Sequence, residues 1–370
     1  MILAILVILI LLNFLLGFYN KKKNTLLFIN FVFILIFMSG YAEGVDIFAY
    51  KYNYELFAEG KEMMFDDIGY VVLSKLCVNL NLTFWGFKFL ATFLALLLLF
   101  SGIKRLHVNP HFVLACYMSY QMMMDTIQYR NFLGWCILFF SFPFLFENTR
   151  KGNVKYIIGV IISALFHSAL LANLLFILIG KKSIIRFMRN TIIFVGVVLS
   201  VLTLLNNYRV PFIDIVINMF SLDYVGGYTN EAASGPHGVS YLLSIITVIA
   251  EITFFGYQFR IYKPDEKAKN LFNIDKLSVL FLPLCIMSFQ FYRLIRNIKL
   301  LSLCGVDWCY QKNLRSSNHR RIVLAFCIVF LGFWIYSDFF RFVTLNNMRT
   351  LFDNNIYWSV KYKELGQWIR

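Results

Sequence analysis

The sequence predicts an all-α integral membrane protein with roughly 10–12 membrane passes. Of the 370 residues, 59% are hydrophobic and only 15% are charged, whereas soluble domains carry about 25% charged residues. The apolar residues come in runs long enough to cross a membrane, and basic residues flank most of these runs. We therefore expect one multi-pass membrane domain over residues 1–370, with outer loops that carry short amphipathic helices.

The net charge of +15 arises from 35 Lys and Arg against 20 Asp and Glu. This balance would suggest nucleic-acid binding in a soluble protein, but the chain has no aromatic and basic motif of that kind. Basic residues at the cytoplasmic ends of spans, facing anionic lipid, explain most of the charge. The chain also has no Walker motif, no G-x-G-x-x-G and no His/Cys cluster with metal-ligand spacing. We expect membrane lipid as a partner, and no nucleic acid, cofactor or metal.

The first half of the chain alternates apolar runs with polar loops. The run Met1 to Phe18 has no basic start and no cleavage site, so we expect a span and not a signal peptide. The lysines 21–23 predict a cytoplasmic loop and an outer N-terminus. An acidic, tyrosine-rich loop over residues 43–82 is then expected outside. The further predicted spans, separated by an inside loop at 104–105 and an outside turn at 125–130, cover residues 25–42, 84–103, 109–124 and a run ending near 146.

Two later apolar stretches conflict with the positive-inside rule, because each has basic residues on both flanks. Residues 156–180 are long enough to cross the membrane once, at about 37 Å, or twice only as short helices of ~18 Å. A re-entrant hairpin that bends near Phe166-His167-Ser168 resolves the conflict, and one tilted helix is the alternative. Residues 278–311 present the same conflict, and a second hairpin there places Arg293, Arg296 and Lys299 near the outer face or in mid-membrane.

The rest of the second half follows the rule. We expect an outside loop over residues 207–238, an inside loop over 260–276 and an outer C-terminal tail over 338–370. The remaining spans are predicted at residues 191–206, 239–259 and 321–337.

Three arginines fall where the positive-inside rule predicts few cations: Arg130, Arg293 and Arg296. A charged side chain inside a membrane segment costs about 2.5–3.5 kcal/mol on insertion scales, so it is a candidate for function. The planar guanidinium suits phosphate oxygens, and several arginines in a cavity open to the outer leaflet would hold a pyrophosphate. The alternative is that these side chains snorkel, or pair with Asp125 or another carboxylate.

His167 lies in an apolar run and has two interpretations. A neutral imidazole can accept a proton from a hydroxyl group. A lone histidine in a membrane segment is also commonly a packed residue with one hydrogen bond, and sequence alone favours that interpretation.

Asp46, Tyr50 and Tyr54 are spaced i, i+4 and i+8, which on a helix aligns a carboxylate and two phenols on one face. Aromatic rings with carboxylates suit sugars, which have apolar faces and hydroxyl edges. Asp67 and Tyr70 follow in the same loop, within Asp67-Ile68-Gly69-Tyr70. An interfacial aromatic belt would explain the tyrosines but not Asp46.

These motifs, in this order over about residues 40–300, resemble the EpsG family, the Wzy-like polymerases of bacterial surface polysaccharides. The resemblance rests on the 46–54 and 67–70 motifs, on Tyr129-Arg130-Asn131-Phe132-Leu133-Gly134 and on Phe166-His167-Ser168-Ala169-Leu170. A late arginine, Arg293, fits the family's basic position near the last spans.

The resemblance implies glycosyl transfer at the outer face of the bacterial cytoplasmic membrane. The donor would be a glycan on polyprenyl pyrophosphate and the acceptor a lipid-linked repeat unit, with a flippase and a chain-length regulator as possible partner proteins. Arg130 and Arg293 would stabilise the departing pyrophosphate. His167 or Asp46 would deprotonate the acceptor hydroxyl, and Tyr50 and Tyr54 would pack on sugars.

Two other functions stay open. A glycosyltransferase that uses a polyprenyl-phosphate sugar would depend on Asp46 or Asp67 more than on Arg130. A flippase or exporter of lipid-linked glycans should show repeated halves with cavity charges in both, and we detect no such repeat.

Overall fold

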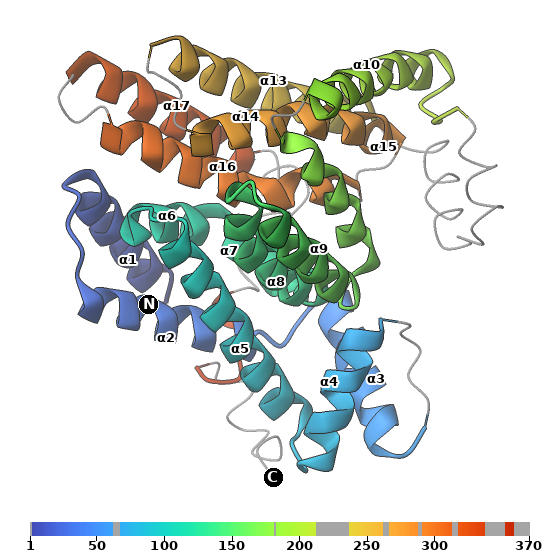
Figure 1. Cartoon of the computed structure of the whole chain (residues 1–370). Helices are drawn as coiled ribbons and strands as arrows, with labels where there is room; N and C mark the ends of the chain where they lie inside the picture. The colour runs from blue at the N-terminus through green and yellow to red at the C-terminus, as the bar shows by residue number, and fades with distance from the viewer. Residues whose placement is uncertain are drawn as a thin grey trace. The chain divides into compact units, whose positions relative to one another are not determined.

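The computed structural model describes residues 2–61, 67–180, 183–211, 237–261, 266–287, 291–312, 317–336 and 352–358. Within these residues the chain is almost entirely helical and forms no strand, apart from one isolated antiparallel bridge between Tyr41 and Asn355 (Figure 1). This confirms the predicted all-α class. Four described helical stretches are long and apolar enough to cross a membrane, as expected of a membrane protein: Phe84–Arg105, Tyr129–Phe146, Ser183–Leu205 and Lys269–Met287. The number of passes stays a prediction.

The chain divides into two compact units, each described by itself. Unit 1 contains residues 1–171 and 306–370, and unit 2 contains residues 172–305. The expectation of a single multi-pass domain stays a prediction. The predicted outer loop at 207–238 lies largely outside the described residues, as does most of the predicted tail at 338–370.

The helices of unit 1 begin where the sequence offers caps. Thr83 and Thr149 each accept a backbone N–H of the following turn, from Gly86 at 3.3 Å and Gly152 at 2.9 Å, which satisfies donors that a helix start leaves unpaired. The helices are α1 (Ile2–Phe18), α2 (Asn24–Gly40), α3 (Val45–Ala58), α4 (Ile68–Asn79), α5 (Phe84–Arg105), α6 (Pro110–Cys116), the π-helix η1 (Tyr117–Gln121), α7 (Met122–Ile127), α8 (Tyr129–Phe146), α9 (Arg150–Ala164) and α17 (Ser317–Ile335).

Buried polar side chains connect the first helices of unit 1. Asn13 of α1 and Asn30 of α2 exchange amide hydrogen bonds of 3.0 and 2.9 Å. The ring of His111 bonds Asn13 through Nδ1 at 2.7 Å and accepts the backbone N–H of Lys23 through Nε2 at 3.0 Å. Because buried polar groups must find partners, these bonds fix the loop between α1 and α2 against the start of α6.

The described part of the C-terminal tail packs at the end of α2. Backbone bonds join Ala42 N to Asn354 O at 3.0 Å and Ile356 N to Gly40 O at 2.9 Å. The Asn355 amide donates to Phe37 O at 3.1 Å. The predicted outer loop leaves from this same end of α2; that the tail lies outside stays a prediction.

Unit 2 is built from η2, α10, α13, α14, η3, α15 and most of α16. Glycines allow close helix contact: a Cβ on Gly196 would lie 3.0 Å from the backbone of Leu280, as is common where membrane helices approach closely. The elements are the 3₁₀-helix η2 (Ser168–Ile179), which begins in unit 1, α10 (Ser183–Leu205), α13 (His237–Ile261), α14 (Glu266–Leu277), η3 (Ser278–Phe281), α15 (Leu282–Met287) and α16 (Tyr292–Lys312), which ends in unit 1.

The first predicted hairpin region contains a break in the helix, whereas residues 288–290 of the second lie outside the described residues. The α-helix α9 ends at Ala164 and η2 begins at Ser168, at the predicted bend. In the later stretch, α15 ends at Met287 and α16 begins at Tyr292, so Arg293, Arg296 and Lys299 lie in the first turns of α16. Whether either stretch enters and leaves on one side of the membrane stays a prediction.

Candidate functional site

The candidate site lies in unit 1, around the N-terminal ends of α5 and α8. Helices α3 and α4, both from the predicted outer loop, lie together beside the N-terminal end of α5 (Figure 1). The structure confirms that the i, i+4, i+8 motif is helical, because residues 46–54 all fall within α3. Residues of the 46–54, 67–70, 129–134 and 166–170 motifs meet there.

Arg130, in the first turn of α8, forms an ion pair with Asp67, which precedes α4. The sequence left Asp125 or another carboxylate open as its partner; the structure shows Asp67 in that role, and Asp125 is buried within α7. The side chains of Arg130 and Asp67 keep 23% and 15% of their surface exposed. The pair is therefore shielded from bulk water but still accessible to a ligand.

Aromatic rings complete the surroundings of Arg130. Its guanidinium carbon lies 5.3 Å from the centre of the Tyr50 ring, within cation–π range. The Tyr50 ring lies 5.9 Å from that of Tyr70, which packs edge-on against Phe87 of α5 at 5.4 Å. Tyr50 and Tyr70 are both buried. The two motif tyrosines thus connect Arg130 to the α5 side of the cluster.

Tyr54 has a packing role in this cluster. Only 2% of it is exposed, its ring stacks on Phe87 at 5.1 Å, and its hydroxyl donates to Leu82 O at 2.8 Å. Burial raises the pKa of the Tyr54 phenol well above its usual range, so the hydroxyl stays protonated and keeps this bond. Asp46, two turns before Tyr54, is exposed in the first turn of α3. Direct sugar contacts by the 46–54 and 67–70 motifs stay predictions.

The segment that carries His167 is pressed against the 67–70 and 129–134 motifs. Gly69 N donates to Leu165 O at 2.8 Å, and a Cβ on Gly69 would lie 3.0 Å from that oxygen and from the Phe166 ring. A Cβ on Gly134 would lie 2.6 Å from Ser163 O and from Leu170. Both motif glycines therefore leave room for this segment. Half-buried His167 lies between these contacts, in the turn that separates α9 from η2.

Lys88 is a member of this region that sequence analysis missed. It is fully buried in α5, donates to Tyr41 O, and has its ammonium 5.6 Å from the ring centres of Tyr41, Trp85 and Tyr129. The Tyr129 hydroxyl donates to Lys88 O at 2.8 Å. The signal was present, because a lysine inside a long apolar helix is a candidate for function.

Arg293 and Arg296 lie in unit 2, on α16. Arg293 is partly buried, whereas only 1% of Arg296 is exposed. One turn further along, buried Lys299 donates to the Tyr292 hydroxyl. That these arginines and Arg130 hold one pyrophosphate stays a prediction.

Two buried carboxylates near Lys299 were also missed by sequence analysis. Glu251 of α13 interacts electrostatically with Lys299 and with Asp275 of α14, and Ser302 bonds the Asp275 carboxylate at 3.4 Å. Both carboxylates are buried. The two carboxylates repel each other, whereas Lys299 and Ser302 offset part of the cost of burying them and connect α16 to α13 and α14 within unit 2.

The Arg130 region can bind an anionic group that is partly withdrawn from water. A guanidinium offers five N–H donors in a planar fork, and the ion pair with Asp67 engages Nη1. The low-dielectric surroundings strengthen its interaction with a phosphate oxygen. A carboxylate beside the arginine fixes its position and limits how strongly it attracts anions when no ligand is bound.

Comparison with known proteins points to one family. The sequence profile of the EpsG family matches residues 25–349, which is most of the chain. No curated protein and no solved structure matches the chain.

Proposed function

Because the chain belongs to the EpsG family, we propose that it joins polyprenyl-pyrophosphate-linked repeat units into a bacterial surface polysaccharide. The family is polysaccharide-polymerase-like and membrane-associated, which supports glycosyl transfer in general. The reaction proceeds at the outer face of the cytoplasmic membrane. A flippase supplies the lipid-linked units, and a chain-length regulator acts on the product.

The observation that carries this proposal is the meeting of the four motifs around the Arg130–Asp67 ion pair. In the proposed reaction, a hydroxyl oxygen of the acceptor sugar attacks the anomeric carbon of the donor. The bond from that carbon to the pyrophosphate oxygen breaks, and the pyrophosphate leaves on its lipid. Arg130 stabilises the developing negative charge, which is an electrostatic contribution to catalysis. Arg293 and Arg296 act on the same pyrophosphate.

The proton of the attacking hydroxyl needs an acceptor, and His167 or Asp46 takes that role. His167 is half-buried and its segment touches both motif glycines, so a neutral imidazole there is held in place. Asp46 is exposed in the first turn of α3. Positive charge for the leaving group comes from arginine, and no metal or cofactor enters the proposal.

Tyr50 is the best supported of the four proposed sugar contacts, because its ring lies over Arg130. A sugar stacked near this ring would bring its pyrophosphate toward the guanidinium. Tyr70 then supports Tyr50 directly, Tyr54 packs on Phe87 beside Tyr70, and Asp67 holds Arg130 in place.

The test expresses either Arg130→Ala or Arg150→Ala in a strain from which the natural gene for this protein is deleted. Arg150 is exposed at the start of α9, so its removal changes the charge equally without touching the site. We expect Arg130→Ala to reduce long polymer about 10²–10³-fold, the effect of losing one donor to a developing charge. Single lipid-linked units should accumulate on the outer face. Asp67→Asn should reduce long polymer less than Arg130→Ala does, because it releases the Arg130 side chain but leaves the Arg130 charge in place.

Three results would contradict the proposal. Long polymer that is unchanged in both Arg130→Ala and Arg293→Ala rules out the arginine mechanism. Units that accumulate on the inner face identify a flippase. Loss of activity in Asp46→Asn or Asp67→Asn, with Arg130→Ala still active, identifies a glycosyltransferase that uses a polyprenyl-phosphate sugar. Immunoblots of membranes check that each variant is present at equal amount.

A further inference from the structure

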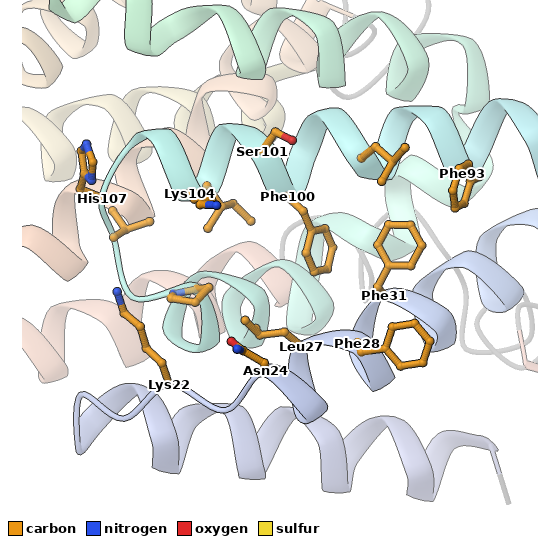
Figure 2. A pocket seen from close by; sticks show the side chains of 14 residues that line it. Lys22, Asn24, Leu27, Phe28, Phe31, Phe93, Phe100, Ser101, Lys104 and His107 are labelled. Carbon is orange, nitrogen blue, oxygen red and sulfur yellow. The ribbon is translucent and has the colours of Figure 1, made fainter.

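A groove of about 880 Å³ lies between α2 and α5 in unit 1, at the opposite end of α5 from Arg130. Figure 2 shows phenylalanine rings from both helices along one part of the groove and Lys22, Lys104 and His107 at the other part. We propose that this groove binds one anionic phospholipid of the inner leaflet, with its phosphate at the three basic side chains and an acyl chain along the rings.

The apolar part of the groove has a defined aromatic wall. The Phe31 ring meets Phe93 at 5.7 Å and Phe100 at 5.3 Å, both in edge-to-face contact. Phe28 keeps 68% of its surface exposed and Leu97 keeps 43%. Such large exposed apolar side chains favour contact with a lipid chain over contact with water.

The length of this wall fits one leaflet. From Lys104 to Phe93 the helix rises about 17 Å, at roughly 1.5 Å per residue. Half of a hydrocarbon core that is about 30 Å thick measures ~15 Å. An acyl chain whose phosphate rests at Lys104 would therefore follow the wall through most of one leaflet.

The charge of the groove is one-sided. Among its lining residues, all of which the structure describes, Lys22, Lys104 and His107 are basic or can become so, and none is acidic. All three are exposed. The neighbouring Arg105 points elsewhere, with its guanidinium 4.8 and 4.2 Å from the rings of Phe140 and Phe144. Asp307 interacts with Lys22, but this carboxylate is fully buried, does not line the groove and accepts the backbone N–H of Asn109 at 2.8 Å.

The basic end of the groove is held in position before a ligand arrives. The loop that carries Lys22 is tied down by the bond from Lys23 N to His111 Nε2 at 3.0 Å, and by the Asn109 amide, which donates to Asn20 at 3.2 Å. His107 has φ +56°, the left-handed turn that ends α5. Preorganised loops reduce the entropy lost on binding.

The inner leaflet is the expected source of the lipid. The lysines at 21–23 and the pair at 104–105 both lie in predicted cytoplasmic loops. Anionic headgroups are concentrated in that leaflet and attract basic side chains near the surface. Lys88 lies about 24 Å away along α5, so this groove is separate from the Arg130 region. The inference therefore does not depend on the polymerase proposal.

The test measures lipid retained by the full-length protein in native mass spectrometry, after exchange into mixtures of phosphatidylglycerol and phosphatidylcholine. We expect one phosphatidylglycerol per chain to be retained preferentially. The double variant Lys22→Ala, Lys104→Ala should weaken retention about 30-fold, from the typical contribution of two lysines near anionic lipid. The control Lys21→Ala, Lys151→Ala removes the same charge from exposed residues that do not line the groove and should retain the lipid.

A second variant covers the case in which the double variant does not fold. Leu97→Trp fills the groove from a partly exposed position and keeps both lysines, so it should also lose the lipid. Equal loss in the control pair, equal retention of phosphatidylcholine, or full retention by Leu97→Trp would overturn the proposal. Displacement of the lipid by inorganic phosphate alone, or tighter binding of a polyprenyl phosphate, would also overturn it, because either shows another occupant.

Discussion

Lys88 and Lys104 lie on the same helix, about 24 Å apart along its axis, yet their surroundings differ. Lys88 is fully buried, donates to Tyr41 O and has three aromatic rings around its ammonium. Lys104 is exposed at the rim of an apolar groove. At the N-terminal end of α5, groups of the protein itself surround the Lys88 ammonium. The C-terminal end leaves its cations exposed, where an anion from outside the chain can meet them.

The same contrast appears in the residues around each lysine. Near Lys88, the Arg130–Asp67 ion pair and the two motif glycines connect segments that are distant in sequence. Near Lys104, hydrogen bonds also join segments that are distant in sequence, the loop before α2 and the residues at the start of α6, but the cations at the groove stay exposed. We therefore expect the buried first end to hold the fixed geometry that the proposed catalysis requires, and the exposed second end to admit a ligand from outside the chain.

The largest expected effect tests whether the N-terminal end is closely packed. Gly134→Ala would place a methyl group 2.6 Å from Ser163 O and Leu170. Overpacking of this kind costs about 1–3 kcal/mol, so the thermal unfolding temperature in detergent should fall clearly. Gly332→Ala is the control, because no atom lies within 4 Å of its added Cβ; an alanine in that helix should be neutral or stabilising. Equal unfolding temperatures would mean that the His167 segment does not press against α8.

Local patterns in the sequence predicted the elements of this region but not its contacts. The 46–54 spacing predicted helix α3, and the basic flanks of 156–180 predicted the break near His167, because both signals lie within a few turns of chain. The Arg130–Asp67 pair joins residues 63 positions apart. Several carboxylates were available to Arg130, and only the packing of α4 against the His167 segment selects Asp67.

The buried charges are a second feature that the sequence did not predict. Lys88, Glu251 and Asp275 each lie inside apolar helical stretches. The positive-inside rule concerns charges in the loops, so it does not identify charges inside apolar helices. Their partners come from other helices, so their compensation becomes visible only in the folded chain.

An intermediate effect is expected from Lys88→Met, which removes the buried charge but keeps the length of the side chain. Lys88 has no ion pair within the part of the chain that the structure describes, so its removal should not lower the unfolding temperature, because desolvation of the ammonium is avoided. Polymer output should nevertheless fall about fivefold, the effect of about 1 kcal/mol from one charge on a neighbouring reaction centre. If output is normal, Lys88 serves only the packing of Tyr41 and Tyr129.

The smallest effect is expected from the same substitution at the other end, Lys104→Met. Lys104 is about 24 Å from Lys88 along α5, beyond the roughly 8 Å screening length at physiological salt, so its charge acts little on the Arg130 region. Polymer output should stay within about twofold of the natural chain, while retention of anionic lipid falls, by about fivefold for one lysine. Lys88→Met and Lys104→Met each remove one positive charge from the same helix, so the two variants can be compared directly. Equal losses of polymer in both variants would show that the two ends of α5 act on one process, and the contrast between them would no longer hold.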